Sequence, residues 1–532
     1  MKKHTVRTLS AMMATALLLG ACTSPAQPPA GGGGGGATGT TAADAPAGGG
    51  GADGDVRDEL TVAMATFIIS LDPVMQNDTP SHQVRQMIFE PLIRFDPHTQ
   101  ELYGVLATNW DMPDAQTVNF ELRQGVYFSN GDRFTGHDVA YTFERALESS
   151  FTRAMFGAID HVEVVDDYNV TFHLNMPFVP ILNQLTFVQA SIVNARAAQE
   201  LGDAFQDSPV GTGPFVLDHM VLGDRTVVTR NDNYWGPAPH LRQVTFRVVP
   251  EQSNRFIEVE TGNADIALMI APTDVPRAEE TPSVELHRTP NFSYNYIGFN
   301  MRSDGPIADE RVRHAITYAL DIDAIVHNAF AGTGQRLTGP VTSLTQYHIP
   351  MEPFTPNLDR ARELLAEAGY PDGFSVRFWS NEGNQARADV GVMVQHQLRE
   401  IGIEVTTEVV EWATYLERMG QAEHDMFILG WVGSMDPDFH LYMLFHSENL
   451  GTSGNMSWLD HPEVDRLLDE GRMELDPVRR GEIYAEFQQL IRDIRPHIFL
   501  HQSEELNIST PEVRGFRSSA DVLPRFWQVY FE

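Results

Sequence analysis

The chain has 532 residues, of which 42% are apolar, and its formal net charge is −35 at pH 7. This length predicts two or three domains, because a single hydrophobic core stops growing well below it. The excess of acidic side chains disfavours nucleic acid and anionic lipid as partners, since both carry negative charge. Lysine occurs only at positions 2 and 3, a composition compatible with a salty habitat or with a GC-rich genome.

The N-terminus has the pattern of an export signal. A basic head with Lys2, Lys3 and Arg7 precedes an apolar run over residues 11–19, which is too short to span a bilayer. The run ends in LGAC, whose Cys22 is the only cysteine of the chain. This ending resembles the lipobox of bacterial lipoproteins, which implies that Cys22 is lipidated and becomes the new N-terminus. A plain secretory signal with an incidental cysteine is the alternative.

Residues 23–58 follow the signal and consist mostly of Gly, Ala, Pro, Ser and Thr. A segment with so few bulky side chains cannot bury enough surface to fold. It is therefore predicted to be a flexible linker. A flexible coil of this length reaches roughly 30–35 Å. We therefore expect a tether between a lipid anchor and a globular body.

Strands and helices alternate from residue 59 onward, which predicts an α/β architecture. The clearest turn signal is Asn130-Gly131, and the clearest helix start is the capping-box-like pair Thr135 and Asp138. The predicted elements of the first half are a strand at 59–67, a helix ending near Pro91 and a short strand within 82–97, a strand at 117–122, a helix at 139–147, a hairpin at 161–174, and strand, loop, strand, helix and strand over 228–268.

Gly211 and Gly213 lie in a stretch rich in Gly and Pro, residues 208–220. The stretch superficially resembles a phosphate loop, but no Lys-Ser or Lys-Thr follows and no helix is predicted there. We interpret the two glycines as a point where two backbone segments cross closely.

The second half is predicted to be rich in amphipathic helices. Within residues 309–326, Val312, Ile316, Ala319 and Leu320 fall on one helical face, which predicts a single helix. Further helices are predicted at 357–369, 389–402, 461–471 and 476–494.

The globular part lacks the common catalytic motifs. It has no cysteine nucleophile, no Gly-x-Ser-x-Gly elbow and no His-Glu-x-x-His helix. His497 and His501 have a spacing that would suit a metal on a helix. The apolar residues between them instead indicate a buried strand, where positions four apart are too distant for one ion. We therefore expect no catalytic residues, no metal site and no cofactor.

The order of several segments is recognisable. These are FEPLIRFDP, FELRQGVYFSNGDRFTGHDVAYTFERAL, PVGTGPF, NDNYWG, TGNADIA, DERVRHAITYALDIDAIV, ARELLAEAGYPDGF and LGWVGSMDPDFHLYMLF. Together they resemble the bacterial extracytoplasmic solute-binding proteins of family 5, the peptide/nickel class of ABC importers. The resemblance implies a hinged, two-lobed periplasmic-binding-protein fold of type II with an extra domain inserted in the N-terminal half. It assigns residues 59–95, 221–298 and 503–532 to lobe I, 96–220 to the extra domain and 299–502 to lobe II.

The resemblance also implies a ligand site around residues 431–436. Trp431 is expected to line the cleft. In dipeptide and oligopeptide binders, an aspartate three residues after this tryptophan pairs with the ligand ammonium, and Ser434 stands there instead. The arginine that dipeptide binders use for the ligand carboxylate is replaced by Asn381. Asp436 is then the nearest carboxylate for an ammonium, or else a turn residue before Pro437.

Other aromatic residues are expected near the ligand. Trp379 and Phe67 are candidate walls of the cleft. The backbone of residues 293–296 is expected to bind a peptide as an added strand, which places Tyr294 and Tyr296 at the site. Packing within the sheet is the alternative for both tyrosines.

The hypothesis is a non-enzymatic, lipid-anchored receptor outside the cytoplasm, a monomer that delivers peptides to the permease and ATPase of an ABC importer. An alternative keeps the fold but changes the ligand to a glutathione-like conjugate, an oligosaccharide or a metal chelate. Alternatives from other classes are a secreted metal-dependent hydrolase using Asp436, Asp438 and a histidine, and a signalling or chaperone-like protein that has lost transport.

Overall fold

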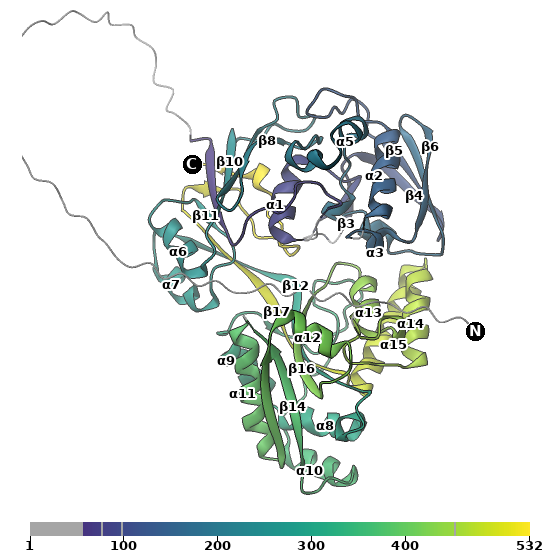
Figure 1. The fold of residues 1–532 in the computed structure, drawn as a ribbon, viewed down its shortest axis with the longest axis vertical. Helices are drawn as coiled ribbons and strands as arrows, with labels where there is room; N and C mark the ends of the chain where they lie inside the picture. Colours follow the sequence, from purple (N-terminus) through teal and green to yellow (C-terminus); the bar gives the residue numbers. More distant parts are fainter. Residues whose placement is uncertain are drawn as a thin grey trace, which may run out of the picture. The chain divides into compact units, whose positions relative to one another are not determined.

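The computed structural model describes residues 57–532, apart from 76–77, 97–98, 100, 150, 383 and 452–453. The export signal, Cys22 and nearly all of the predicted linker lie outside the described residues. The described chain has an α/β fold of two lobes with an additional small β-sheet, as predicted (Figure 1). No helix within the described ranges is long and apolar enough to cross a membrane.

One large sheet extends through both lobes. Among the described residues it has eleven strands, in the order β15-β14-β16-β12-β17-β11-β1-β10-β9-β8, with β13 paired to β17. The bounds are β1 Glu59–Met64, β8 Phe215–Val221, β9 Arg225–Arg230, β10 Gln243–Val248, β11 Ile266–Ala267, β12 Glu285–Phe299, β13 Gln335–Arg336, β14 Phe374–Asn381, β15 Ile403–Val410, β16 Met426–Val432 and β17 His497–Ser509.

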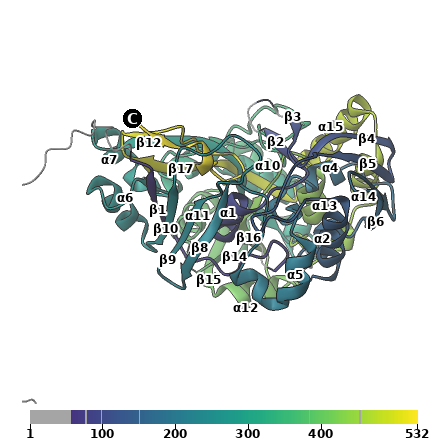
Figure 2. The same ribbon diagram turned by 90° about the horizontal axis from the view of Figure 1, so that it is seen from above.

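The strands β12 and β17 connect the two lobes. Both are long and antiparallel, and they lie side by side in Figures 1 and 2. Their pairing is interrupted between Pro290 and Tyr294, where the Phe292 N–H donates to the Ala520 carbonyl oxygen at 3.3 Å instead of to β17. On the lobe I side of the interruption, β17 pairs with both β12 and β11. On the lobe II side, β12 pairs with both β17 and β16. An interrupted two-strand connection is a suitable hinge.

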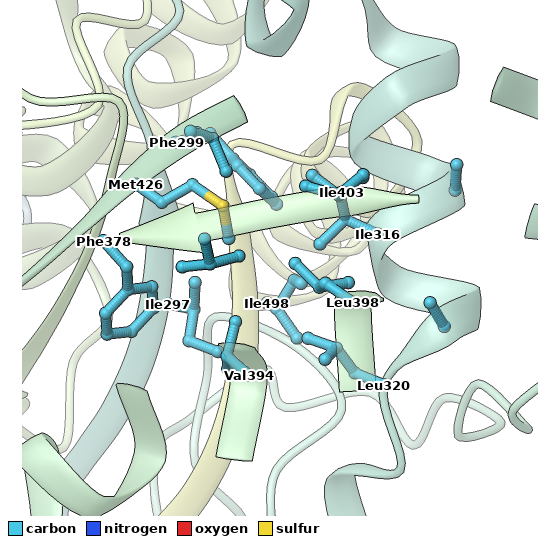
Figure 3. Close-up of a cluster of buried hydrophobic side chains, with 14 of the residues drawn as sticks. Ile297, Phe299, Ile316, Leu320, Phe378, Val394, Leu398, Ile403, Met426 and Ile498 are labelled. Carbon is cyan, nitrogen blue, oxygen red and sulfur yellow. The ribbon is translucent and has the colours of Figure 1, made fainter. Parts of the chain in front are cut away.

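Lobe II has a hydrophobic core on each face of its part of the sheet. Side chains alternate along each strand, so neighbours enter opposite cores. Ile297, Phe378 and Met426 enter one core, which Figure 3 shows together with Ile316 and Leu398 from the covering helices. The helices of this lobe are α8 Glu310–Ala319, α9 Ile322–Ala329, α10 Leu358–Glu367, α11 Gln385–Arg399, α12 Trp412–Met419, α13 Asp438–Phe445, α14 Pro462–Met473 and α15 Pro477–Ile494.

The single helix expected over residues 309–326 is wrong. α8 ends at Ala319, and α9 begins at Ile322. The Asp321 carboxylate accepts a hydrogen bond from the Ala324 N–H at 3.0 Å, which caps a new helix. The apolar residues on both sides continue the same core, so the hydrophobic pattern alone hid the break.

Lobe I is built on β1, β8, β9, β10 and β11. Its core includes side chains of α1 Thr79–Ile88 and of α5 Ala195–Leu201. A smaller core lies against α6 Gln252–Glu260 and α7 Val275–Glu280.

The additional sheet has the order β4-β5-β7-β6 and its own core. The strands are β4 Ala107–Asp114, β5 Thr117–Leu122, β6 Ile159–Asp166 and β7 Asn169–Leu174, and the helix α2 Gly136–Glu148 covers them. The predicted helix start is confirmed, because the Thr135 N–H donates to Asp138 Oδ2 at 2.9 Å. The core of this sheet runs as far as Ile192, whereas Val193 and Phe205 already belong to the core of lobe I.

The predicted close crossing at Gly211 and Gly213 is confirmed. A Cβ on Gly211 would lie 2.1 Å from the carbonyl oxygen of Ile88, and one on Gly213 would lie 2.6 Å from the Ile88 carbonyl carbon. The Gly213 N–H donates to the Ile88 oxygen at 2.8 Å. Only glycine permits this close approach to Ile88, the last residue of α1. The contact fixes the end of α1 and thereby positions Glu90 to Arg94, which follow the helix.

Candidate functional site

A cavity of about 340 Å³ lies where the two lobes and the additional sheet meet. This volume is typical of sites for small solutes. The lobe I wall comes from α1, β2 Ile93–Asp96 and the C-terminal segment, and includes Gln86, Arg94, Phe95, Asp521, Val522 and Arg525. The second wall includes Met155, Asn183, Phe187 and Gln189, and the third includes Phe292, Ser293, Val432, Ser434, Met435 and Phe439.

The lining combines a mainly apolar surface with a few charged groups. Asp521 is the one carboxylate among the described lining residues, and Arg94 and Arg525 are the two guanidinium groups. This gives the cavity a positive excess in a strongly acidic chain. Arg525 is already engaged, because its Nη2 lies 2.7 Å from Asp521 Oδ2 and its Nη1 donates to Gln86 Oε1 at 3.2 Å.

Arg94 differs from Arg525 in its partners. Its guanidinium lies over the ring of Trp527, 4.9 Å from the centroid. Its Nη2 is buried and has no hydrogen-bond partner within the described part of the chain. A buried donor of this kind is costly unless something binds it. Arg94 is therefore the lining cation with an unused donor.

The nearby Glu90 is committed to structure. Its carboxylate accepts hydrogen bonds from the Tyr234 hydroxyl at 2.8 Å, the Trp235 indole at 2.8 Å and the Thr212 hydroxyl at 3.0 Å. Burial raises the pKa of Glu90, and the charge of Arg94 and these hydrogen bonds oppose that shift. Glu90 thus joins parts of lobe I to one another and to Thr212 of the predicted extra domain beside the cavity, and it offsets part of the Arg94 charge.

Asp436 lies next to the cavity but is only 2% exposed. Both of its oxygens accept hydrogen bonds from Arg480, at 2.5 and 2.9 Å. Its Oδ2 also accepts from Asn183 Nδ2 at 3.0 Å, so the carboxylate joins lobe II to the segment that carries the second wall. Burial is the largest single influence and lowers the pKa of Arg480, but the charge and hydrogen bonds of Asp436, together with Tyr484 and Tyr347, outweigh it and the net shift is upward.

Asp438 forms a similar buried ion pair, with Arg472. Arg472 donates to both of its oxygens, at 3.1 and 3.2 Å. The carbonyl of Arg472 accepts from the Val179 N–H at 2.9 Å, and its guanidinium lies 5.3 Å from the Phe178 ring centroid. The two aspartates and their arginines therefore form a buried network beneath the second wall.

The loop that carries Trp431 and Ser434 reaches the cavity through only part of its length. Ser434 lines the cavity, and its hydroxyl donates to the Asp436 carbonyl at 2.7 Å. Trp431 is half-buried and packs against the second core of lobe II, opposite Tyr294 in the pairing of β12 with β16. It does not belong to the cavity lining, whereas its neighbour Val432 does.

Tyr294, Tyr296 and Trp379 are at most 1% exposed and belong to the second core of lobe II. The backbone of residues 294–296 is paired with β16 on one side and β17 on the other. For residues 294–296 this corrects the expectation that the backbone of residues 293–296 would bind a peptide as an added strand. Such binding needs a free strand edge, which residues 294–296 do not have.

Asn381 and Phe67 lie elsewhere. Asn381 accepts a hydrogen bond from Arg387 Nη1 at 2.8 Å at the end of β14, outside the cavity lining. Phe67 is 40% exposed and lies in a shallow surface pocket with Leu222. The ligand roles expected for Trp431, Ser434, Asp436, Tyr294, Tyr296, Trp379, Asn381 and Phe67 stay predictions.

His497 and His501 lie in β17, which confirms the predicted strand. Burial lowers the pKa of His497 to about 3 and of His501 to about 4, so both are neutral. Within the described ranges, no group of three or more His, Cys, Asp or Glu side chains is placed to hold a metal ion.

The sequence interpretation did not single out Arg94, Asn183, Asp521 or Arg525. Arg94 is present in the recognised motif FEPLIRFDP, but only its missing partner distinguishes it from other arginines. Asn183 Oδ1 is likewise buried without a hydrogen-bond partner among the described residues. Among the described lining residues, Arg94 Nη2 is thus a donor and Asn183 Oδ1 an acceptor without a partner.

Comparison with known proteins is consistent with this fold. The model of the bacterial extracellular solute-binding proteins, family 5 Middle, matches residues 101–452. The glutathione-binding protein GsiB of Escherichia coli O1:K1 / APEC is 29% identical over 470 residues, which cover 86% of this chain and 91% of GsiB.

Two solved structures illustrate the similarity. The ABC transporter-associated periplasmic binding protein DppA from Helicobacter pylori, in complex with peptide STSA, has 27% identity and a TM-score of 0.76, over 89% of this chain and 98% of DppA. NikA from Brucella suis, in complex with Fe(III)-EDTA, has 22% identity and a TM-score of 0.81, over 89% of this chain and all of NikA. The likeness to NikA concerns the fold alone.

Proposed function

The chain belongs to family 5 of the bacterial extracellular solute-binding proteins, and we propose that it captures peptides or peptide-like solutes in the cavity between its lobes. The solute then passes to the permease and ATPase of an ABC importer. The protein acts as a receptor and not as an enzyme, and closure of the lobes is the step that holds the solute.

The unused donor on Arg94 carries this proposal. A peptide ends in a carboxylate, which is the natural partner of a guanidinium. Its amide groups suit the buried Asn183 Oδ1, and its side chains suit the apolar surface of Phe187, Met435 and Phe439. Two relatives at 27–29% identity bind solutes of this class, glutathione in the case of GsiB and peptide STSA in the case of DppA.

Isothermal titration calorimetry with the variant Arg94→Gln tests the proposal. We expect the affinity for peptides with a free C-terminal carboxylate to fall about tenfold to a hundredfold, because a charge-assisted hydrogen bond contributes about 1.5–3 kcal/mol. Peptides with an amidated C-terminus should bind the variant and the wild type alike.

Arg302→Gln is the matched control. Arg302 also lies 4.9 Å over a tryptophan ring, that of Trp458, but does not line the cavity. Its replacement should leave both affinities unchanged. If Arg94→Gln binds peptides with a free carboxylate as tightly as the wild type does, Arg94 is not the anchor. Binding of an oligosaccharide or a metal chelate, with no response to any peptide, would overturn the peptide proposal itself.

We propose further that the body is tethered outside the cytoplasm by a lipid on Cys22, through the linker of residues 23–58, and that it acts as a monomer. Proximity to the membrane favours delivery to a permease, because a tether raises the effective concentration there. The division into lobe I (59–95, 221–298 and 503–532), extra domain (96–220) and lobe II (299–502) is part of the proposal. The separate cores support it, although residues 193–205 pack with lobe I.

A further inference from the structure

A second, smaller cavity of about 30 Å³ lies within lobe II, away from the cavity between the lobes. Its lining comes from α8, α9, β13, the segment around Phe354, the end of α15 and the start of β17. Three of the described lining residues are arginines, Arg336, Arg492 and Arg495, and none of the described lining residues is acidic.

The three guanidinium groups are held around one residue, Phe354. Arg492 and Arg495 lie over its ring, with their Cζ atoms 4.4 and 3.9 Å from the centroid. Arg336 Nη2 donates to the Phe354 carbonyl oxygen at 3.1 Å. The arginines are therefore close neighbours despite their like charge.

The backbone fixes the arginines in this arrangement. Arg492 Nη2 donates to the Glu352 carbonyl oxygen at 2.7 Å. Arg495 caps α15 in the left-handed conformation, with φ of 59°, and its Nε donates to the Arg492 carbonyl oxygen at 2.9 Å. A non-glycine residue in this conformation needs support from its surroundings.

The negative charge around this cavity is small. Asp323 pairs with Arg336 at 2.7 Å, but its side chain is 72% exposed. The negative charge of Asp493 raises the pKa of Arg495, whereas the positive charge of Arg313 lowers it. Burial, and then the charge of Arg492, lower the pKa of Arg495 to about 10. Arg495 is thus a cation at neutral pH, and the neighbouring charge of Arg492 repels it.

Two donors on residues of the cavity lining lack acceptors. Arg336 Nε and Arg492 Nη1 are buried and have no hydrogen-bond partner among the described residues. Nδ1 of His497 is a further buried ring nitrogen without a partner there, and it is a donor in one of the two neutral tautomers. His497 is only 2% exposed and stacks on Tyr296, so its ring cannot turn towards solvent. Buried N–H groups normally have partners, so the two guanidinium nitrogens indicate a bound acceptor.

We propose that this cavity binds a small inorganic anion of the size of chloride. About 10–15 Å³ is enough for one water molecule, so the cavity has room for one such ion and its nearest water. A neutral water would satisfy donors without offsetting the charge of three arginines, whereas an anion does both. The site is independent of the solute proposed above, because the two cavities share no lining residue.

Anomalous diffraction from crystals of the full chain soaked in sodium bromide tests this site directly. We expect a bromide peak within hydrogen-bond distance of Arg336 Nε and Arg492 Nη1. The peak should lose most of its height in Arg492→Gln and persist in Arg399→Gln, an exposed arginine at the end of α11 in the same lobe. Water alone at the site in the wild type, or an undiminished peak in Arg492→Gln, would overturn the proposal.

Thermal unfolding in sodium chloride and in sodium gluconate at equal ionic strength provides a second measurement. An ion bound only by the folded state raises the melting temperature with its concentration. We expect the wild type to melt several degrees higher in chloride, and the difference to shrink by more than half in Arg492→Gln or, should that variant fail to fold, in Arg336→Gln. Equal melting temperatures in the two salts for the wild type would contradict a bound anion.

Discussion

Asp436 and Asp438 are neighbours in sequence and each has its own arginine. Asp436 is held by Arg480, and Asp438 by Arg472. Burial raises the pKa of Asp438, and the charge and hydrogen bonds of Arg472 oppose that rise. Removal of one partner from such a buried pair costs about 3–5 kcal/mol, because the other charge is left uncompensated. A substitution at either aspartate would therefore change folding as well as binding.

At the same scale, Glu505 predicts a pH dependence of stability. It lies in β17 near the hinge, accepts a hydrogen bond from Asn291 Nδ2 at 3.3 Å, and faces Asp521. Burial, together with the charge of Asp521, raises its pKa from 4.5 to about 7. The folded state then holds this proton more tightly than the unfolded state. The stabilisation is full below pH 4.5 and is lost as the pH rises through 7.

We expect this loss to amount to roughly 3 kcal/mol in the wild type, since one pKa unit corresponds to about 1.4 kcal/mol. Urea unfolding at pH 5 and pH 8 measures it. Glu505→Gln should show a smaller fall in the free energy of unfolding between the two pH values. Glu512→Gln, at an exposed position near the same strand, should behave as the wild type. An equal fall in all three proteins would contradict the assignment to Glu505.

At the scale of elements, the two lobes have two kinds of connection. The strands β12 and β17 join them covalently, and their interrupted pairing at Pro290 allows bending. The segment 178–183, which packs with the additional sheet, reaches lobe II by contact alone, through Val179 with Arg472 and Asn183 with Asp436. We infer that this second connection is made on closure and lost on opening, because a hinge motion separates contacts but not strands.

The variant Asn183→Ala tests this contact. Without the hydrogen bond to Asp436, the closed state should lose about 1 kcal/mol, and peptide affinity should fall about fivefold for free and amidated peptides equally. Calorimetry measures the affinity, and small-angle scattering with and without peptide measures closure.

Asn175→Ala is the control for that experiment, because the Asn175 amide donates to Gly157 within the same domain at 2.7 Å. A loss of affinity with unchanged closure in the scattering experiment would instead assign the effect to the proposed contact of Asn183 Oδ1 with the peptide amides.

At the scale of the whole molecule, the proposed anchor and the proposed cavity are separate. The described lining residues of the cavity begin at Thr79, well beyond Cys22 and the linker. The variant Cys22→Ser is therefore expected to move the protein from the membrane fraction to the soluble fraction without a change in peptide affinity. Cell fractionation and incorporation of labelled fatty acid measure this. Membrane association and labelling that persist in the variant would contradict lipidation of Cys22.

The sequence by itself determined the local elements, because their signals lie within a few residues of one another. The capping pair Thr135 and Asp138, the glycines at 211 and 213, and the strand at His497 were all readable. The ordered motifs also predicted the family and the two-lobed fold. The break between α8 and α9 was missed because apolar residues on both sides of Asp321 enter one core.

Only the tertiary structure decided which side chains are available to a solute. The cavity draws its lining from segments as far apart as Thr79 and Arg525. Arg94 and Asp436 are both charged groups in recognised motifs, but Asp436 is satisfied by Arg480 and Asn183, whereas Arg94 Nη2 has no described partner. Such availability depends on partners that are distant in sequence, so it follows from packing and not from local pattern.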